Sequence, residues 1–237
     1  MATRIATICA RAGSKGVPKK NQLELQGAKL IEITIGQAVK SGMFDVVAVS
    51  SDDTSILDVA QGMGLEHVVK RPHELSGDRV SKPKTIKHLV EVVEKSLSKE
   101  FETVVDLDIT SPLRFPYDIE EAINLLELNG LDSVLSAGPS RRNPYFNMVR
   151  YKNDGKLDIV NNSEGNFIAR QDAPSCFDLN GSINVWNRNK LFENPQIILD
   201  RTKVYEMKPE QTFDIDHQFD VELMQFLYAR FISIIEP

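Results

Sequence analysis

The first 137 residues alternate short apolar runs with longer amphipathic segments, and this rhythm constrains the fold more than any other feature of the chain. The short runs are rich in valine and isoleucine, whereas the longer segments repeat apolar residues at helical spacing. The expected strands are Ile5–Ala10, Asp45–Ser50, Glu66–Val69, Thr103–Leu107 and Ser133–Ala137, and the expected helices are Leu30–Ser41, Thr54–Met63, Lys84–Ser98 and Tyr117–Asn129. Strands joined by helices of this length predict an α/β fold: a single Rossmann-like, three-layer α/β/α domain with a mainly parallel sheet.

The alternation stops at Gly138-Pro139. Residues 140–180 are polar, show no helical period and contain Asn153-Asp154-Gly155, which is typical of a hairpin turn. A long segment of this kind inside a compact domain usually serves a site or a subunit contact. We therefore expect one domain over residues 1–237 with an inserted arm at 140–180. A strand at Ser182–Trp186 and a closing helix at Asp220–Ile234 are expected after the arm.

The charge of the chain is segregated. Lys and Arg number 28 and Asp and Glu 34, a net charge of −6, yet residues 1–23 hold five basic residues and no acid. A nucleic-acid partner is not expected, because such proteins need a basic face. A membrane partner is not expected either, because no apolar run approaches the roughly 20 residues of a membrane helix. Two cysteines, Cys9 and Cys176, favour a reduced, cytoplasmic setting.

The basic cluster coincides with the loop that follows the first expected strand, residues 10–21. In a parallel sheet, ligands bind at the carboxyl ends of the strands. Glycines in this loop would let a phosphate approach the backbone, and Arg11, Lys15 and Lys20 would neutralise its charge. The loop matches neither the Walker A pattern nor the dinucleotide glycine pattern. A solvated basic loop is the alternative interpretation.

The same loop resembles the nucleotide-binding signature of the CMP-sialic acid synthetases, cytidylyltransferases that activate nine-carbon sugar acids with CTP. The signature reads Arg11-x-x-Ser14-Lys15-Gly16 followed by Lys20-Asn21. Six further matching segments follow in the same order: Val49-Ser50-Ser51-Asp52, Arg71-Pro72 with Glu74-Leu75, Thr110-Ser111-Pro112-Leu113-Arg114, Arg170-Gln171, Asn180-Gly181-Ser182 and Asp214-Ile215-Asp216. The resemblance implies a homodimeric, Mg²⁺-dependent enzyme that transfers CMP from CTP to the anomeric hydroxyl of a nonulosonic acid and releases pyrophosphate.

The resemblance also implies roles for individual residues. The expected nucleotide-binding residues are Arg11, Gly13, Ser14, Lys15, Asn21, Arg71 and Ser81, and the expected catalytic residues are Lys20 and Arg170. A guanidinium at Arg170 could stabilise charge on the transferring phosphate, and a surface arginine on the arm is the alternative. Asp108, Asn180 and Ser182 are the expected substrate-binding residues. Turn chemistry around Gly181 explains the last two residue types equally well.

Asp214 and Asp216 are the expected Mg²⁺ ligands. They stand two residues apart in an apolar context, so in an extended segment both carboxylates point to the same face. Magnesium takes one or two protein carboxylates together with phosphate oxygens and waters. A solvated Asp-x-Asp at a strand end is the alternative. The group that deprotonates the attacking hydroxyl stays open between metal-bound solvent and Asp108.

Two residues depart from the sialate-activating pattern. Asp108 stands where those members usually carry a glutamine that faces the sugar acid, and Lys82 replaces a common small hydroxyl residue. Residues 144–147 also lack a basic residue that many of those members have. A carboxylate facing the sugar's own carboxylate is repulsive unless a cation lies between them. We therefore expect an acceptor other than N-acetylneuraminate, with legionaminic acid first. A nucleotidyltransferase for Kdo or a sugar phosphate, and a non-catalytic nucleotide-binding regulator, are the alternatives.

Overall fold

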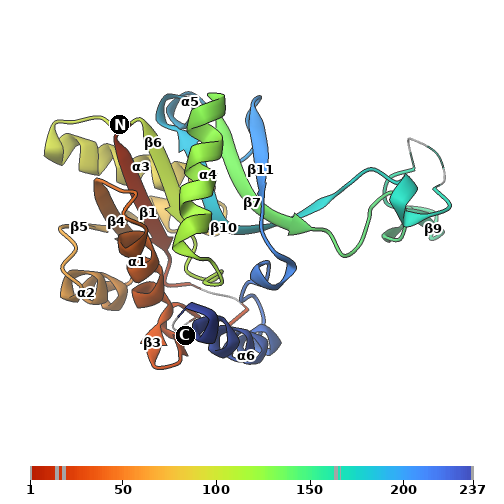
Figure 1. The fold of residues 1–237 in the computed structure, drawn as a ribbon, viewed down its shortest axis with the longest axis horizontal. Helices are drawn as coiled ribbons and strands as arrows, with labels where there is room; N and C mark the ends of the chain where they lie inside the picture. The colour runs from red at the N-terminus through yellow and green to blue at the C-terminus, as the bar shows by residue number, and fades with distance from the viewer. Residues whose placement is uncertain (1, 14–15, 18–19, 163–164, 166, 236–237) are drawn as a thin grey trace.

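A seven-stranded sheet forms the centre of the molecule, in the order β11-β7-β10-β6-β1-β4-β5 (Figure 1). The computed structural model describes residues 2–13, 16–17, 20–162, 165 and 167–235, without the side chains of residues 21, 234 and 235. The strands are β1 (Arg4–Ala10), β4 (Val46–Ser51), β5 (His67–Lys70), β6 (Thr103–Leu107), β7 (Ser133–Pro139), β10 (Phe177–Asn187) and β11 (Thr202–Glu206). Strand β10 runs antiparallel to both β6 and β7, and the other neighbouring pairs are parallel. The mainly parallel sheet expected from the sequence is confirmed.

Helices cover both faces of the sheet. They are α1 (Leu30–Ser41), α2 (Thr54–Gly62), α3 (Lys82–Leu97), α4 (Pro116–Asn129), α5 (Arg188–Glu193) and α6 (Gln218–Ile235). Successive strand residues point to opposite faces, so Val105 packs in the core under α1, α2, α4 and α6, whereas Val104 packs under α3 and α5. The three-layer arrangement is confirmed. None of the helices in the described ranges is long and apolar enough to cross a lipid bilayer.

Local sequence sets the ends of these helices. Helix α1 ends at Gly42, whose φ of 64° is the left-handed conformation that glycine adopts most easily. Helix α2 begins after Asp53, whose carboxylate accepts a hydrogen bond from the Ser55 backbone N–H at 2.9 Å. Helix α4 begins at Pro116, a residue suited to the first turn. The starts of α2 and α4 bound the loops that leave the carboxyl ends of β4 and β6, whereas Gly42 leads the chain to the amino end of β4.

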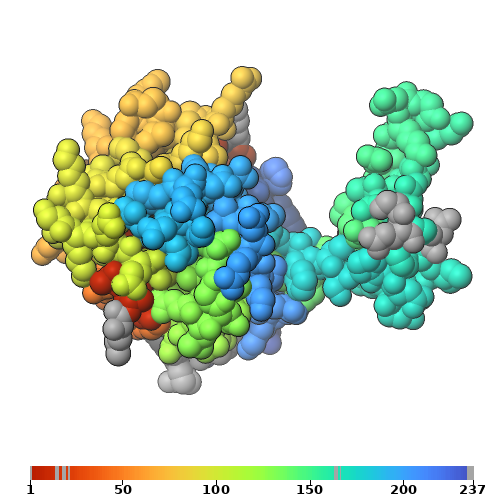
Figure 2. Space-filling view, turned by 90° about the horizontal axis from the view of Figure 1, so that it is seen from above, coloured from red at the N-terminus to blue at the C-terminus, as the bar shows by residue number. Residues whose placement is uncertain are grey.

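Between β7 and β10 the chain leaves the body of the molecule as an arm (Figure 1), which Figure 2 shows as a separate lobe. The base of the arm is a two-stranded ribbon in which Phe177 pairs with Pro139, and the Ser140 N–H donates to the Cys176 carbonyl at 2.9 Å. The arm carries the antiparallel hairpin of β8 (Val149–Tyr151) and β9 (Leu157–Ile159). The hairpin turns at Gly155 with a φ of 80°, within the segment where the sequence predicts a turn.

Several elements were not expected from the sequence. Strand β10 begins at Phe177, five residues before the predicted start, and its first half lies in the arm. Strand β11 and helix α5 follow it. The smaller additional elements are β2 (Glu24–Leu25), β3 (Ala28–Lys29) and the 3₁₀ turns η1 (Lys20–Gln22), η2 (His73–Leu75), η3 (Arg170–Asp172) and η4 (Pro209–Gln211). Of these, η1 and η2 border the site described next.

Candidate active site

A cavity of about 510 Å³ opens beyond the carboxyl ends of β1, β5 and β6. This is the edge of a parallel sheet at which ligands bind, and the volume is in the range of small-molecule sites. The predicted site residues that line it are Arg11, Gly13, Lys20, Arg71, Asp108, Asp214 and Asp216. Residues from both ends of the chain therefore meet in one cavity.

Arg11, Arg71 and Lys20 are among the cations on the wall of this cavity. The Arg11 guanidinium pairs with Asp78 at 2.7 Å, so the first loop and the loop before α3 meet at the cavity. Arg71 is buried and donates from Nη2 to the Ser50 carbonyl at 2.8 Å. Lys20 comes from η1. Together these side chains provide the charge needed to hold an anionic ligand.

Asp214 and Asp216 face the same cavity, as the alternation argument predicts. Ile215 between them is completely buried, and its N–H donates to the Thr110 carbonyl at 3.1 Å. Lys20 Nζ lies 3.0 Å from Asp216 Oδ1. Burial raises the pKa of Asp214 to about 6, and the negative charge of Asp216 adds to the effect. Two crowded carboxylates of this kind favour a cation between them.

These two carboxylates would need help to hold a metal ion. Within the described ranges, no group of three His, Cys, Asp or Glu side chains is arranged for metal binding. A divalent ion at Asp214 and Asp216 would therefore take its remaining ligands from substrate phosphates and water. That donor set suits Mg²⁺, which usually keeps several waters and binds one or two protein carboxylates.

Gly16 lies against this carboxylate segment. A Cβ built at Gly16 would come within 1.9 Å of the Asp216 carbonyl oxygen, so a larger residue forces the segment to move. We expect Gly16→Ala to lower CTP turnover by about 100-fold, because a displacement of about 1 Å at a catalytic group has a cost of this order. Initial rates with CTP as the implied substrate measure the effect.

The matched control is Gly36→Ala in the interior of α1. A Cβ at Gly36 meets nothing within 4 Å, and alanine is a better helix former, so this variant should keep the wild-type rate. Equal rates for Gly16→Ala and Gly36→Ala would contradict the close approach described above.

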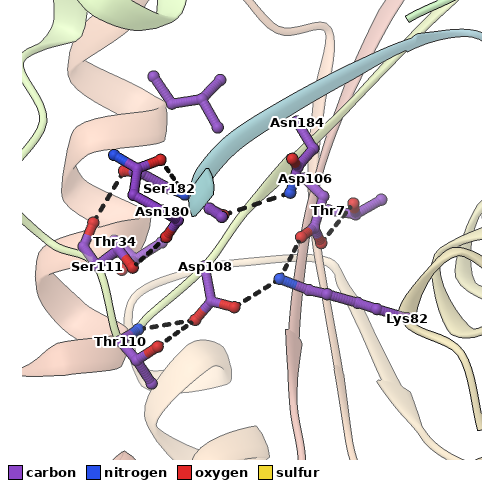
Figure 3. Close-up of polar contacts among 12 residues, drawn as sticks. Thr7, Thr34, Lys82, Asp106, Asp108, Thr110, Ser111, Asn180, Ser182 and Asn184 are labelled. Atoms are coloured by element: carbon purple, nitrogen blue, oxygen red, sulfur yellow. Dashed lines mark hydrogen bonds and ion pairs between the residues drawn. The ribbon is translucent and has the colours of Figure 1, made fainter. Parts of the chain in front are cut away.

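The remaining side of the cavity holds a lysine between two aspartates (Figure 3). Lys82 Nζ lies 2.7 Å from Asp106 Oδ2 and 2.6 Å from Asp108 Oδ2. Burial would lower the pKa of Lys82, but the two carboxylates raise it well above its usual range. Burial would raise the pKa of Asp108, but the charge and hydrogen bond of Lys82, with hydrogen bonds from Thr110, hold it well below the usual range. Lys82 and Asp108 are therefore both charged at neutral pH.

Asp106 lies at the buried end of this cluster. Its side chain is completely buried, and Thr7 Oγ1 donates to Asp106 Oδ1 at 3.1 Å. Burial is the largest influence on Asp106 and raises its pKa despite the nearby Lys82 ammonium. Asp106 and Asp108 share one face of the end of β6, as strand alternation requires. No sequence pattern predicts that Lys82 lies between both carboxylates.

Asn180 and Ser182 lie behind the cavity wall. Asn180 Oδ1 accepts from Ser136 Oγ at 2.6 Å and from the Ser182 N–H at 3.2 Å. Ser182 Oγ donates to the Ser111 carbonyl at 2.9 Å. Neither side chain lines the cavity, because both are buried at the turn of β10, where they satisfy backbone and side-chain polar groups. These contacts are of the kind expected around the turn at Gly181, and a role of the two residues in substrate binding stays a prediction.

Arg114 connects this second layer to the cavity. Its guanidinium is completely buried and donates to the Ser182 carbonyl at 2.6 Å and to the Asp108 carbonyl at 2.9 Å. Further donors reach Gln37 Oε1 at 2.9 Å and Thr34 Oγ1 at 3.1 Å. Burial lowers the pKa of Arg114 to about 10, and the nearby carboxylates oppose the shift, so the side chain keeps its charge at neutral pH. The sequence contained Arg114 within a motif but gave it no role.

The other predicted residues lie elsewhere. Ser81 is exposed at the start of α3, between the cavity residues Val80 and Lys82. Arg170 lies on the arm in η3, where its guanidinium donates to the Arg141 carbonyl, and it does not reach the cavity of its own chain. Ser14, Lys15 and the side chain of Asn21 fall outside the described residues.

Two cavity residues that the sequence did not single out are Cys9 and Asp78. Burial raises the pKa of the Cys9 thiol to about 12, so it stays protonated at neutral pH and is a poor nucleophile. Asp78 is recognisable only from its ion pair with Arg11, which joins residues far apart in the sequence. No local pattern around either residue signals a place in the site.

Comparison with known proteins agrees with this geometry. Residues 5–230 match a family model described as cytidylyltransferase. The chain is 38% identical over 229 residues to CMP-N,N'-diacetyllegionaminic acid synthase of Campylobacter jejuni, covering 97% of this chain and 96% of that protein. It is 32% identical over 218 residues to N-acylneuraminate cytidylyltransferase of Streptococcus agalactiae, covering 91% of this chain and 51% of that protein.

A solved structure of CMP:2-keto-3-deoxy-manno-octonic acid synthetase complexed with CTP has the same fold, with a TM-score of 0.69, 18% identity and coverage of 97% of this chain and 99% of that one. At this identity the likeness concerns the fold alone. The family match and the near-full-length relative carry the assignment, and they confirm the family resemblance stated from the motifs. The chain belongs to the cytidylyltransferase family.

Proposed function

We propose that this enzyme transfers CMP from CTP to the anomeric hydroxyl of a nonulosonic acid, with Mg²⁺ as cofactor and pyrophosphate as the leaving group. The observation that carries the proposal is the cavity that joins Arg11, Lys20 and Arg71 to Asp214 and Asp216. Attack of a hydroxyl on the α-phosphate mainly requires positioned reactants and neutralised charge. Cations and a carboxylate pair that line the same cavity can position the reactants and neutralise their charge.

The nucleotide would occupy the side of the cavity formed by the first loop and β5. Arg11, Lys20 and Gly13 line the cavity. Arg11 and Lys20 would meet the triphosphate, and Gly13 would give the phosphates access to the backbone. Lys20 would act as a catalytic cation as charge moves to the pyrophosphate. We place Ser14, Lys15, Asn21, Arg71 and Ser81 in the same nucleotide-binding set.

Asp214 and Asp216 would hold Mg²⁺ at the triphosphate. The bound ion would neutralise charge on the phosphates, which lowers the cost of expelling pyrophosphate. Lys20 already pairs with Asp216, so it lies close enough to share that task. Asp108 is a weak candidate for the base that deprotonates the hydroxyl, because its pKa is held well below the usual range.

The acceptor that we propose is a legionaminic-type nonulosonic acid. The near-full-length relative from Campylobacter jejuni is named for N,N'-diacetyllegionaminic acid. Asp108 and Lys82, two of the departures from the sialate-activating pattern, lie together on the wall of the cavity.

We also propose a cytoplasmic location, which is supported by two cysteines that form no disulfide.

A pyrophosphate-release assay tests the function. CTP, UTP and GTP are each combined with N-acetylneuraminic, legionaminic, pseudaminic and Kdo acids in the presence of Mg²⁺. We expect release with CTP only, fastest with legionaminic acid. Comparable rates with UTP or GTP, or with Kdo alone, would support a different nucleotidyltransferase. Tight CTP binding without release from any acid would support a non-catalytic regulator.

We also propose that the arm forms a homodimer. Its residues Tyr151, Leu157 and Ile168 are 75%, 58% and 94% exposed, and Tyr151 pairs with Leu157 across the hairpin. Large apolar side chains exposed on one segment support a contact with another protein surface. Arg170 lies on the same arm, away from its own cavity. In a dimer, the arm of one subunit could bring Arg170 to the cavity of the other, where a guanidinium would stabilise the transferring phosphate.

Mixing two inactive variants tests this shared site. Arg170→Ala should lower turnover by about 100-fold, the usual cost of losing one donor to the transition state. When Arg170→Ala and Asp216→Asn subunits are refolded together, each mixed dimer contains one site with both residues intact, so activity should return. If the mixture is no more active than the two variants measured separately, Arg170 does not act across subunits.

A further inference from the structure

Lys82 and Asp108 form a charged pair on the wall of the cavity. The Lys82 side chain is 29% exposed and that of Asp108 is 27% exposed, and both line the cavity. Asp106, the second partner of Lys82, is completely buried behind them. Figure 3 shows Lys82 reaching from α3 to the end of β6, between the two carboxylates. The pair therefore presents two adjacent charged groups to a ligand and is held from behind by a third.

The hydrogen bonds around the pair leave one donor and one acceptor. An ammonium has three N–H donors; Lys82 Nζ donates a hydrogen bond to Asp108 Oδ2 and forms an ion pair with Asp106 Oδ2, which is buried and accepts no hydrogen bond from the described residues. Asp108 Oδ1 accepts from the Thr110 N–H at 2.9 Å and from Thr110 Oγ1 at 2.8 Å, whereas Asp108 Oδ2 accepts from Lys82. Within the described residues, the third Lys82 donor and the second lone pair of Asp108 Oδ2 have no other partner.

A hydroxyl group fits this donor and acceptor together. Its oxygen can accept from Lys82 while its proton is donated to Asp108 Oδ2, since Lys82 Nζ and Asp108 Oδ2 are only 2.6 Å apart. A carboxylate cannot do the same, because it has no proton to donate and meets the negative charge of Asp108. The secondary amide of an N-acyl group is also unsuited, because its N–H and C=O point in opposite directions.

We propose that Lys82 and Asp108 act as one specificity-determining unit that recognises a hydroxyl group of the acceptor sugar acid. The unit keeps the acceptor's carboxylate away from this part of the cavity and fixes which ring or side-chain hydroxyl lies there. This inference rests on the proposed function, since the ligand is the acceptor named above. Arg114 supports the unit by donating to the Asp108 carbonyl, which fixes the position of the carboxylate.

Binding, measured without turnover, tests the unit. Calorimetry follows legionaminic acid, and then each of its monodeoxy analogues, titrated into enzyme saturated with Mg²⁺ and a CTP analogue that has a methylene group between the α- and β-phosphates. We expect one analogue to bind wild-type enzyme at least about 10-fold more weakly than the parent acid, because hydrogen bonds to charged groups have a cost of this size when lost. In the double variant Lys82→Met/Asp108→Asn, that analogue and the parent acid should bind equally.

Further variants separate recognition from folding. Lys82→Arg keeps the charge beside both carboxylates but moves the donor, so it should fold and bind the CTP analogue normally while the discrimination between acid and analogue falls. Lys84→Met, an exposed lysine in the same first turn of α3, should retain wild-type discrimination. Affinity for the CTP analogue should stay constant in all variants.

The outcomes are distinguishable from those of the proposed function. Acid binding with the expected discrimination, but without pyrophosphate release, would overturn the proposed reaction and leave the unit standing. Unchanged discrimination in the double variant, or equal binding of every analogue by wild-type enzyme, would overturn the unit. Failure of legionaminic acid and all its analogues to bind would overturn it as well.

Discussion

Replacing either Asp214 or Asp216 with asparagine is expected to lower pyrophosphate release from CTP by about 1,000-fold or more, because charge stabilisation by a catalytic metal ion contributes several kcal/mol to the transition state. Asparagine has nearly the same shape as aspartate but lacks the charge that holds a divalent cation. Both side chains face the cavity from either side of the buried Ile215, so neither change disturbs the core. Initial rates at saturating Mg²⁺ measure the effect.

The variants should fold at least as well as wild-type enzyme. Burial and the neighbouring Asp216 raise the pKa of Asp214 to about 6, which means that ionising Asp214 in the folded protein is unfavourable when no cation is bound. Removal of its charge therefore relieves repulsion. Asp58→Asn, at an exposed position of α2, is the matched control and should keep full activity. Wild-type rates in both Asp214→Asn and Asp216→Asn would remove these residues from the metal site.

Arg114→Met is expected to lower the free energy of unfolding by at least about 3 kcal/mol, because it leaves buried acceptors without donors. The guanidinium is completely buried and is hydrogen-bonded to carbonyl and side-chain oxygens of α1, of β10 and of the segment that follows β6. Methionine fills a similar length but donates to none of them. Urea unfolding at pH 7, where Arg114 is charged, measures the change as a lower midpoint at constant slope.

Arg150→Met is the control for this substitution. Arg150 lies on β8 in the arm and is exposed, so the change should alter the free energy of unfolding by no more than about 0.5 kcal/mol. If Arg114→Met lowers the free energy of unfolding by less than about 1 kcal/mol, water replaces the missing donors, and the network does not fix the backbone at Asp108 and Ser182.

The fold was predictable where local and tertiary signals agree. The bounds of α1 match the prediction because apolar spacing marks its buried face and Gly42 ends it with a positive φ. Strand β11, in contrast, could not be predicted from the hydrophobicity of its own sequence. It lies at the edge of the sheet, pairs only with β7, and has no fully buried side chain, so its sequence carries no apolar run.

The site was predictable only in part, for a similar reason. Short motifs of a few residues each are enough to predict the chemistry of Arg11, Lys20 and the Asp214–Asp216 pair. The role of Lys82 depends on the first turn of α3 lying over the end of β6, which no local pattern encodes. Asn180 and Ser182 matched a motif, yet their side chains turn inward to buried partners, because the bend of the chain decides which atoms reach the cavity.

The position of β10 has a consequence for the order in which the molecule is assembled. β10 lies between β6 and β7, although the arm separates it from β7 in the chain. During synthesis, β6 and β7 are complete long before residues 177–187 emerge. Until then, the edge of each strand that pairs with β10 has no partner. The seven-stranded sheet can form only after the whole arm has been synthesised. A chain interrupted within the arm would leave β7 without either of its neighbours and β6 with an open edge, and its expected fate is aggregation and not a smaller folded enzyme.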